Sequence, residues 1–504
     1  MRIVEGVVYT EATGELGEME DARQALRVFD PAAYQDPNFM SGLWDGHRSL
    51  IDEQGRILTG LMPFVEPLLR ANGIDFDIKR QAPGTFDTIS PDLLPGITLR
   101  DYQLKGIQKF VYHKRGLIVI PGGGGKTEIC VAVHAHLQEQ NPDLRTLVVV
   151  NRTKLADQTV RRFKKYDFDD VCVLGGGKAR KGYQTSVVVA LIQSLSNGLK
   201  KGNQAVIDLL EAVDLVIFDE THHLGANTWA QVGQTCEAEY RLGLSATPFE
   251  ESMIPTTYRD LLLMGILGPV RLFMDTNSLV SRGVLAKPVV MMLGHPSTAV
   301  RTYEYHEVYS QGIVEAVPRN HLALATAWRL YERGFKVLML VQRIEHGKQL
   351  IRTLAEQGYE DPIFSFGGGK NFTVDGEGDA VPSSMKEDAV FSFLDDSDRY
   401  IFVGSSVYDQ GIDIPSLNAV IILSGGKKLR PTLQRAYRAM RPKPTDVGNV
   451  AYIFDFFDQH HVFLRKQSED RIALYRQMDF EIFEGSEAFF RLDEVVGPML
   501  PEKN

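Results

Sequence analysis

The sequence predicts an α/β protein in which two parallel sheets follow one another along the chain. From about Leu99 onward, short runs of β-branched residues alternate with longer amphipathic stretches, the order of strands and covering helices in a parallel sheet. The runs form two series, and two helical stretches of the second series end at Gly334 and Gly358, where left-handed helix caps are expected. We therefore expect two α/β domains in tandem.

The expected elements are short and bounded by turn-forming residues. The expected strands are residues 117–120, 146–150, 186–190, 215–218, 241–244, 337–341, 400–403 and 420–423. The expected helices of the later part of the chain are residues 319–333, 346–357 and 459–478. Residues 370–384, rich in Gly, Asp and Ser, are expected to be a surface loop.

Composition is typical of an ordinary soluble enzyme. A chain of 504 residues suggests roughly three domains. Its 44% hydrophobic and 24% charged residues are close to the averages of globular proteins. The three cysteines, Cys130, Cys172 and Cys236, include no Cys-x-x-Cys pair, which argues against a zinc knuckle or a disulfide framework. No run approaches the ~20 apolar residues of a membrane span, so we expect a cytoplasmic protein with no membrane partner.

The basic residues are unevenly distributed. The net charge of −10 would disfavour a polyanionic ligand if charge were evenly spread, but local patches decide such binding. Residues 427–443 contain seven Lys or Arg residues and no acidic one, and residues 145–165 form a second basic stretch. Each run is either a solvated helix face or a nucleic-acid contact, and charge alone favours neither.

A glycine-rich segment follows the first predicted strand and precedes a helical pattern. It reads Pro121-Gly122-Gly123-Gly124-Gly125-Lys126-Thr127. Glycines let backbone N–H groups converge on phosphate oxygens, Lys126 can reach the β- and γ-phosphates, and Thr127 can bind magnesium. The general pattern has a glycine where this chain has Ile120. The segment predicts a nucleoside triphosphate site, and the alternative is a purely structural turn.

Two carboxylates follow a later strand. Asp219-Glu220-Thr221-His222 comes directly after the apolar residues 215–218, and carboxylates at the carboxyl end of a strand face the ligand crevice of an open α/β sheet. We expect Asp219 to hold magnesium through its water shell and Glu220 to orient or deprotonate the attacking water. His222 and His223 lack further spaced ligands, so we assign no zinc.

A basic helical pattern near the end of the second series carries the third group of candidates. Gln434, Arg438 and Arg441 share one helical face at four- and three-residue spacing. Guanidinium groups on such a face can neutralise the charge that develops on a transferred phosphoryl group. Because they come from the second domain, hydrolysis would depend on domain closure and would be coupled to motion.

Taken in order, these elements resemble the motif set of the superfamily 2 helicases from Leu99 to Asp455. The resemblance implies two RecA-like domains, with ATP and Mg²⁺ as cofactors. Arg100 and Gln103 resemble the element that reads the adenine base. The glycine usual before the first arginine is Tyr437 here, so we expect the packing at that point to differ.

The resemblance assigns further roles. Contacts to the nucleic-acid strand are expected of Arg152, Thr153, Gln193, Ser194 and Ser405. Coupling between ATP and nucleic acid is expected of His222, Ser245 and Thr247. Nucleotide contacts from the second domain are expected of Gly411 and Asp413.

The first hundred residues carry a finer resemblance. Residues 36–46 and 50–61 are similar to the small leading domain of the phage UvsW-type helicases, which remodel forks and Holliday junctions and also unwind RNA–DNA loops. Trp44 is a candidate for stacking on a base or supporting a branch point. The competing interpretation is that Trp44, an aromatic residue in a tight turn, belongs to a core.

We therefore expect four regions. They are a small α+β DNA-binding domain (residues 1–95), a first RecA-like domain with the glycine loop and the acidic pair (96–272), a second RecA-like domain with the arginines (273–456) and a helical C-terminal extension (457–504). The extension is expected to brace the second domain or to touch duplex.

The resulting hypothesis is a monomeric ATP-dependent DNA helicase or translocase that acts on branched, forked or single-stranded DNA, in the host cytoplasm if a phage encodes it. One alternative makes RNA or an RNA–DNA hybrid the track, because the motifs do not distinguish the sugars. Another is a nucleotide-gated clamp that binds DNA without unwinding, which the intact Lys126, Asp219 and Glu220 disfavour. A restriction-system translocase is disfavoured because no segment remains for a nuclease or methyltransferase.

Overall fold

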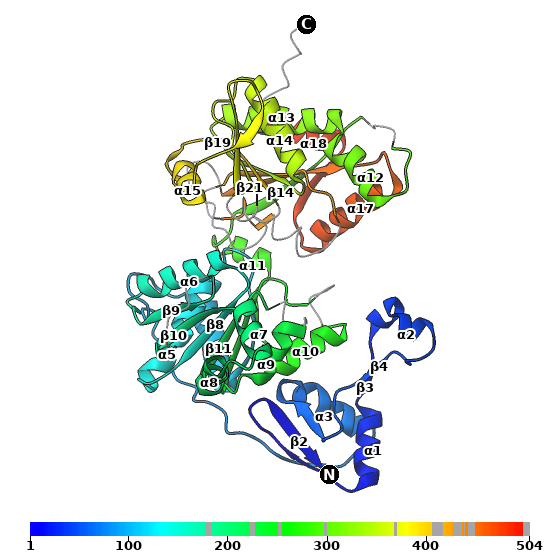
Figure 1. Cartoon of the computed structure of the whole chain (residues 1–504), viewed down its shortest axis with the longest axis vertical. Coiled ribbons are helices and arrows are strands. Elements are labelled where there is room, and N and C mark those ends of the chain that lie inside the picture. Colours follow the sequence, from blue (N-terminus) through cyan, green and yellow to red (C-terminus); the bar gives the residue numbers. More distant parts are fainter. Residues whose placement is uncertain are drawn as a thin grey trace. The chain divides into compact units, whose positions relative to one another are not determined.

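The chain forms two compact units in a computed structural model (Figure 1). The structure describes residues 1–176, 183–221, 227–249, 255–296, 300–366, 370–405, 417–426, 436–437, 439–441 and 449–496. The first unit comprises Met1–Pro121 and Gly125–Met274, and the second comprises Gly122–Gly124 and Asp275–Asn504. None of the helices in the described ranges is long and apolar enough to cross a membrane.

The N-terminal part of the first unit has a small sheet of its own and a hydrophobic core that Leu261 also joins. Its elements are β1 (Arg2–Val4), β2 (Tyr9–Thr13), α1 (Leu16–Ala25), β3 (Arg27–Phe29), η1 (Pro31–Gln35), α2 (Pro37–Met40), β4 (His47–Ser49), β5 (Arg56–Leu58), η2 (Thr59–Leu61), α3 (Met62–Ala71) and β6 (Asp77–Lys79). The sheet has the order β5-β2-β1-β6, and β3 and β4 form a separate two-stranded ribbon. Ile3, Ala22, Ile57 and Val65, each with no exposed surface, are at the centre of the core.

The rest of the first unit is a seven-stranded parallel sheet covered by helices. Its elements are α4 (Asp101–His113), β7 (Arg115–Val119), α5 (Lys126–Gln140), β8 (Thr146–Val150), α6 (Thr153–Lys165), β9 (Val171–Leu174), β10 (Val187–Leu191), α7 (Ile192–Lys200), α8 (Gln204–Ala212), β11 (Leu215–Asp219), α9 (Asn227–Thr235), β12 (Tyr240–Ser245), α10 (Tyr258–Leu267) and β13 (Val270–Phe273). The strand order is β13-β7-β12-β11-β8-β10-β9. β7, β8 and β10 are buried along their whole length, as strands covered on both faces must be.

The second unit contains a nine-stranded sheet. Its elements are α11 (Thr276–Ser281), β14 (Lys287–Gly294), α12 (Tyr305–Tyr309), the π-helix η4 (Ser310–Val314), α13 (Val317–Glu332), β15 (Lys336–Val341), α14 (Ile344–Glu356), β16 (Phe364–Phe366), β17 (Lys370–Val374), β18 (Ala380–Pro382), α15 (Glu387–Asp396), β19 (Tyr400–Ser405), β20 (Ala419–Ile422), β21 (Val450–Phe457), α17 (Val462–Gln477), β22 (Glu481–Glu484) and α18 (Ser486–Val496). The order is β18-β17-β16-β19-β15-β20-β21-β14-β22, parallel from β16 to β22. Both units thus have the predicted tandem α/β architecture.

The predicted surface loop at residues 370–384 is wrong. β17 and β18 form an antiparallel hairpin that extends the sheet beyond β16. Its turn is closed by Asp375, whose carboxylate accepts hydrogen bonds from the backbone N–H groups of Glu377 and Asp379. Phe372 stacks on Phe364 with 5.8 Å between ring centroids. The Gly and Asp residues that suggested a loop belong only to the turn, and an aromatic contact holds the strand.

The C-terminal extension is helical in α17 and α18, as predicted, and it also contributes the edge strand β22, which pairs with β14. α17 is fixed to the sheet by Arg471, whose side chain is 1% exposed. Its guanidinium donates to both oxygens of Asp455 on β21, at 2.8 and 3.0 Å, and to the carbonyl of Gly426 at 3.0 Å. The extension therefore braces the second unit.

Removing one partner of this buried pair should be costly. We expect Arg471→Met to destabilise the second unit by about 3 kcal/mol, because it leaves the Asp455 carboxylate buried without its cation. Hydrogen–deuterium exchange of peptides from β21 and α17 measures the loss of protection.

Arg465→Met on the same helix is the matched control. Arg465 forms an exposed pair with Glu469, and such pairs contribute at most about 0.5 kcal/mol. Equal protection in the two variants would contradict a bracing role for Arg471.

Candidate functional site

The glycine loop joins β7 to α5 at the carboxyl edge of the first unit's sheet. β7 is fully buried, and just beyond it the N–H of Ile120 donates to the carbonyl of Ser245 at 3.0 Å. Gly125 is the N-cap of α5 with φ 86°, a left-handed conformation that glycine adopts without steric cost. The loop thereby leads into the N-terminus of a 15-residue helix, where backbone N–H groups and the helix dipole favour phosphate.

Lys126 and Gln103 both contact this loop. The Lys126 Nζ donates to the carbonyl of Ile120 at 3.0 Å. Gln103, 2% exposed, accepts the N–H of Arg100 at 2.8 Å and donates to the carbonyl of Gly125 at 3.2 Å. A Cβ at residue 125 would collide with the Gln103 amide. Gln103 therefore holds the loop in place, whatever contact it makes with a base.

The acidic pair ends β11. Asp219 is half-buried, and its Oδ1 accepts the N–H of Glu220 at 3.0 Å. Burial and the neighbouring Glu220 raise the pKa of Asp219 to about 6, opposed by the charge of Lys126. Glu220 has a φ of 54°, a strained conformation for a residue with a side chain and one that concentrates at functional sites. Two adjacent, half-buried carboxylates are a donor set that a divalent cation such as Mg²⁺ would stabilise.

The predicted coupling residues lie between the loop and the acidic pair. β12 is the strand between β7 and β11, and Ser245 at its end is in register with Val119. The Ser245 Oγ accepts the N–H of Thr247 at 3.2 Å, and both side chains are buried. A displacement at the end of β7 or β11 would therefore also displace the Ser245–Thr247 segment. The third coupling candidate, His222, lies outside the described residues.

The predicted strand contacts of the first unit gather at the same edge. Arg152 and Thr153 follow β8, and Gln193 and Ser194 follow β10, the adjacent parallel strand. The Gln193 amide donates to the carbonyl of Asn151 at 3.4 Å, which links the two segments.

Sequence reasoning missed one part of this edge. Gly175 and Gly176 follow β9, both with positive φ. A Cβ at residue 175 would press on Ser194, and one at residue 176 would lie 3.0 Å from Thr153. The signal was available, because consecutive glycines directly after a strand mark a close backbone approach.

The second-unit candidates are described only in part. Ser405 is buried at the end of β19, in register with Val341 at the end of β15. Arg441 is half-buried. The candidates outside the described residues are Gln434, Arg438, Gly411 and Asp413.

Tyr437 occupies the position at which the resemblance led us to expect a glycine. Its ring is 6% exposed, and its hydroxyl forms a hydrogen bond of 3.2 Å with Thr276 on α11. Burial raises the pKa of Tyr437 to about 12. The side chain therefore fills the core where a glycine would leave space.

Trp44 is half-buried in the N-terminal part of the first unit. Its indole N–H donates to the carbonyl of His47 at 2.8 Å, and its ring carries the guanidinium of Arg48 at 4.7 Å. These contacts are those of a supporting residue.

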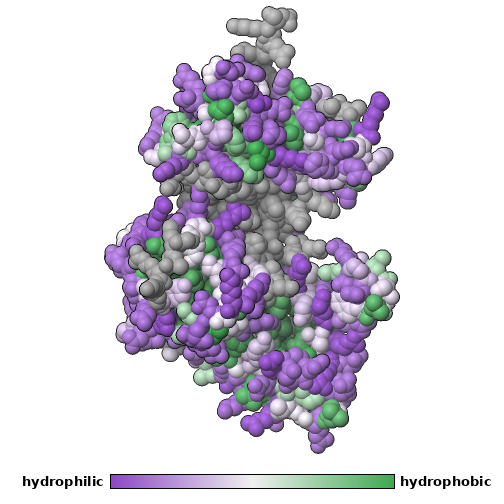
Figure 2. Space-filling model, viewed as in Figure 1, coloured by the Kyte–Doolittle hydropathy of each residue, from purple (hydrophilic) through white to green (hydrophobic). Residues whose placement is uncertain are grey.

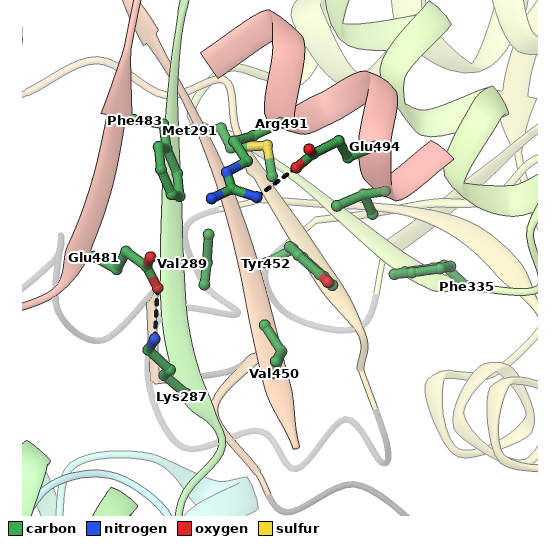
Figure 3. Close-up of a pocket in the computed structure, with 11 residues that line it drawn as sticks. Lys287, Val289, Met291, Phe335, Val450, Tyr452, Glu481, Phe483, Arg491 and Glu494 are labelled. Carbon is green, nitrogen blue, oxygen red and sulfur yellow. Dashed lines mark hydrogen bonds and ion pairs between the residues drawn. The ribbon is translucent and has the colours of Figure 1, made fainter. Parts of the chain in front are cut away.

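Two other features do not belong to the site. A pocket of about 480 Å³ lies between the second unit's sheet and α18 (Figure 3). Its charged residues pair with one another, Lys287 with Glu481 at 2.7 Å and Arg491 with Glu494. Lys287 and Glu481 begin β14 and β22, so the pocket is at the amino end of the strands, whereas ligands of such sheets bind at the carboxyl end.

The second feature is a group of potential metal ligands, His295, Asp458 and His460. Asp458 already accepts a hydrogen bond from Arg319 at 2.7 Å and one from His295 at 3.0 Å. Despite burial, Arg319 and these bonds lower the pKa of Asp458 to about 2. A guanidinium thus supplies the positive charge that a metal would bring, and the group is structural.

Residues 96–250 match the family model described as "Type III restriction enzyme, res subunit". The chain is 26% identical over 419 residues to "Putative helicase 22" of Sulfolobus islandicus filamentous virus, covering 78% of this chain and 70% of that protein. It is 25% identical over 376 residues to "DNA 3'-5' translocase XPB2" of Sulfurisphaera tokodaii, covering 69% of this chain and 79% of that protein.

Two solved structures are similar to this chain, and one of them matches it with a TM-score above 0.5. The ATP-dependent Type ISP restriction-modification enzyme LlaBIII bound to DNA matches 79% of this chain and 32% of its own, with a TM-score of 0.53 and 17% identity. T4 UvsW matches 96% of this chain and 99% of its own, with a TM-score of 0.46 and 17% identity. The first of these matches supports the α/β fold.

The contact between Gln103 and the loop can be tested by one substitution. A glutamate at residue 103 still accepts the Arg100 N–H, but it cannot donate to the Gly125 carbonyl and places a negative charge beside it. We expect Gln103→Glu to weaken nucleoside triphosphate binding about tenfold, measured by titration of a fluorescent analogue.

Gln108→Glu is the control for this substitution. Gln108 lies on the same helix and donates to the carbonyl of Asp87, away from the loop. An equal loss of affinity in both variants would attribute the effect to the helix and would contradict a loop-holding role.

Proposed function

We propose that the chain is an ATP-dependent DNA helicase or translocase of superfamily 2 that acts on branched DNA. The observation that carries the proposal is one sheet edge. The glycine loop, the acidic pair, the Ser245–Thr247 segment and the candidate strand contacts all follow neighbouring parallel strands at their carboxyl ends.

In this proposal each residue of the edge has one task. Lys126 binds the β- and γ-phosphates, and Glu220 orients the attacking water. Mg²⁺, bound through Asp219 and Thr127, would neutralise phosphate charge. Arg438 and Arg441 of the second unit remain our candidates for stabilising the transferred phosphoryl group.

We propose that the protein moves along the nucleic acid by contacting its phosphates. Arg152, Thr153, Gln193 and Ser194 are residues of the kind that contact a phosphate backbone, which carries no sequence information. We therefore expect binding that does not depend on sequence and that weakens steeply as salt increases.

The choice of DNA and of branches rests on two further points. The relative from Sulfurisphaera tokodaii is described as a DNA translocase, and the leading domain resembles that of branched-DNA helicases. RNA is the second candidate, because a relative from Acanthamoeba polyphaga mimivirus, 23% identical over 398 residues, is described as a putative ATP-dependent RNA helicase.

The track is decided by a panel of nucleic acids. We expect ATP hydrolysis and strand separation to be fastest with forks and four-way junctions, slower with single-stranded DNA, and slowest with RNA. Fluorescence-based unwinding and phosphate release measure both activities. Equal or greater stimulation by RNA or by an RNA–DNA loop would replace the DNA assignment, and hydrolysis without strand separation would favour a clamp or a translocase.

The nucleotide site is tested by Lys126→Ala. We expect this variant to lose ATP hydrolysis by at least about a hundredfold while DNA binding survives, because the Lys126 ammonium contacts the glycine loop, where the phosphates are expected. Lys105→Ala, an exposed lysine on α4, is the charge-matched control. Normal turnover by Lys126→Ala would remove this residue from the mechanism.

A further inference from the structure

Helix α17 of the C-terminal extension contacts the turn that follows β20. The turn comprises residues 423–426 and ends in two glycines, and we call it the β20 turn. The chain passes from it directly into the basic segment, residues 427–443, which carries the candidate arginines Arg438 and Arg441. In Figure 1 α17 lies beside α12, and the two helices are in contact. The conformation of the β20 turn therefore sets the direction in which the basic segment leaves the sheet.

Two side chains of α17 bind both backbone groups of Gly426. The Oε1 atom of Gln467 accepts the N–H of Gly426 at 3.0 Å, and the Arg471 guanidinium donates to the Gly426 carbonyl at 3.0 Å. Gln467 and Arg471 are four positions apart, so they share one face of the helix. The opposite side is exposed, with Arg465 and Glu469, and Figure 2 shows mainly hydrophilic surface on this part of the molecule. The inner face of α17 is thus the one that holds the turn.

The β20 turn needs these bonds because glycine by itself does not select one conformation. Gly426 has a φ of 112°, in the left-handed region that glycine enters without steric cost, but glycine enters other regions as readily. A Cβ at residue 425 would lie 3.3 Å from the ring of Tyr309 on α12, so the turn also fits closely against that helix. The hydrogen bonds from α17 therefore fix a backbone that could otherwise adopt several conformations.

Gln467 also joins the turn to α12. Its Nε2 atom donates to the Tyr305 hydroxyl at 3.1 Å, and Tyr305 is the first residue of α12. The Gln467 side chain is half-buried and uncharged, so its removal leaves no buried ion without a partner, in contrast to the removal of Arg471. The effect of Gln467 on the turn can therefore be measured apart from the stability of the second unit.

The other end of the basic segment has anchors of its own. The Tyr437 hydroxyl forms a hydrogen bond of 3.2 Å with Thr276, and the carbonyl of Met440 accepts the N–H of Ala286 at 2.8 Å. These bonds tie the residues next to Arg441 to the second unit. A segment that is fixed at both ends has fewer conformations open to it than one that is fixed at one end.

We propose that Gln467 is a positioning residue for ATP hydrolysis. By fixing the β20 turn, it restricts the basic segment to conformations in which the candidate arginines act on the transferred phosphoryl group. This inference rests on the proposed function. The arginines are needed in the transition state, whereas the glycine loop holds the nucleotide, so Gln467 affects the catalytic step rather than the binding of ATP. The C-terminal extension thereby takes part in hydrolysis without touching the nucleotide.

The substitution Gln467→Ala tests this inference in the full chain. At saturating nucleic acid, we expect the kcat of ATP hydrolysis to fall about tenfold, the effect of one lost hydrogen bond, while the KM for ATP stays unchanged. Gln467→Glu keeps an acceptor for the Gly426 N–H and should restore most of the rate. Hydrogen–deuterium exchange of peptides from β21 and α17 should match that of the unaltered protein in both variants.

Gln477→Ala is the matched control, since Gln477 is an exposed residue of the same type at the end of the same helix. Four results would overturn the positioning role: an unchanged kcat in Gln467→Ala, an equal fall in Gln477→Ala, an equal fall in Gln467→Glu, or a fall accompanied by loss of protection in β21. A higher half-saturating concentration of nucleic acid with unchanged kcat would assign the segment to the track and would also overturn it. Failure of every nucleic acid to stimulate hydrolysis by the unaltered protein would instead overturn the proposed function.

Discussion

The register of one parallel sheet is the constraint on which the candidate site depends. Val119 lies opposite Ser245, Leu244 opposite Asp219, and Val150 opposite Leu191, so the strands end together at one edge. A slip of one residue would turn the end of a strand to the other face of the sheet and separate the acid pair from the glycine loop. The burial of β7, β8 and β10 on both faces prevents such a slip, and the packing of the core thereby sets the geometry of the chemistry.

Much of this edge could be predicted because it depends on local sequence. Each functional segment of the first unit directly follows a run of buried β-branched or aliphatic residues, so locating the strand also locates the segment. The predicted strand at residues 146–150 coincides with β8, and Gly334 and Gly358 have the expected left-handed conformation. The candidate roles of Lys126, Asp219 and Glu220 remain predictions.

What could not be predicted depends on contacts between distant residues. β17 was predicted to be a loop because the sequence around it does not show that Phe372 stacks on Phe364. The bond between Arg471 and Asp455 spans 16 positions, and Arg48 meets Tyr258 across 210. The exposure of a side chain also depends on residues that are distant in sequence. The sequence therefore singled out Trp44, although Met40 and Leu43 are the more exposed side chains.

Helix α10 belongs to two cores. Leu261 packs with the N-terminal residues, whereas Leu263 and Ile266 pack under the seven-stranded sheet, and Gly60 approaches the backbone of Met264 and Gly265 so closely that no side chain fits between them. The predicted boundary near residue 95 therefore does not separate two independent hydrophobic cores. A fragment that began at residue 96 would expose an apolar stripe of α10 to water, and neither piece could be exchanged between relatives without its counterpart.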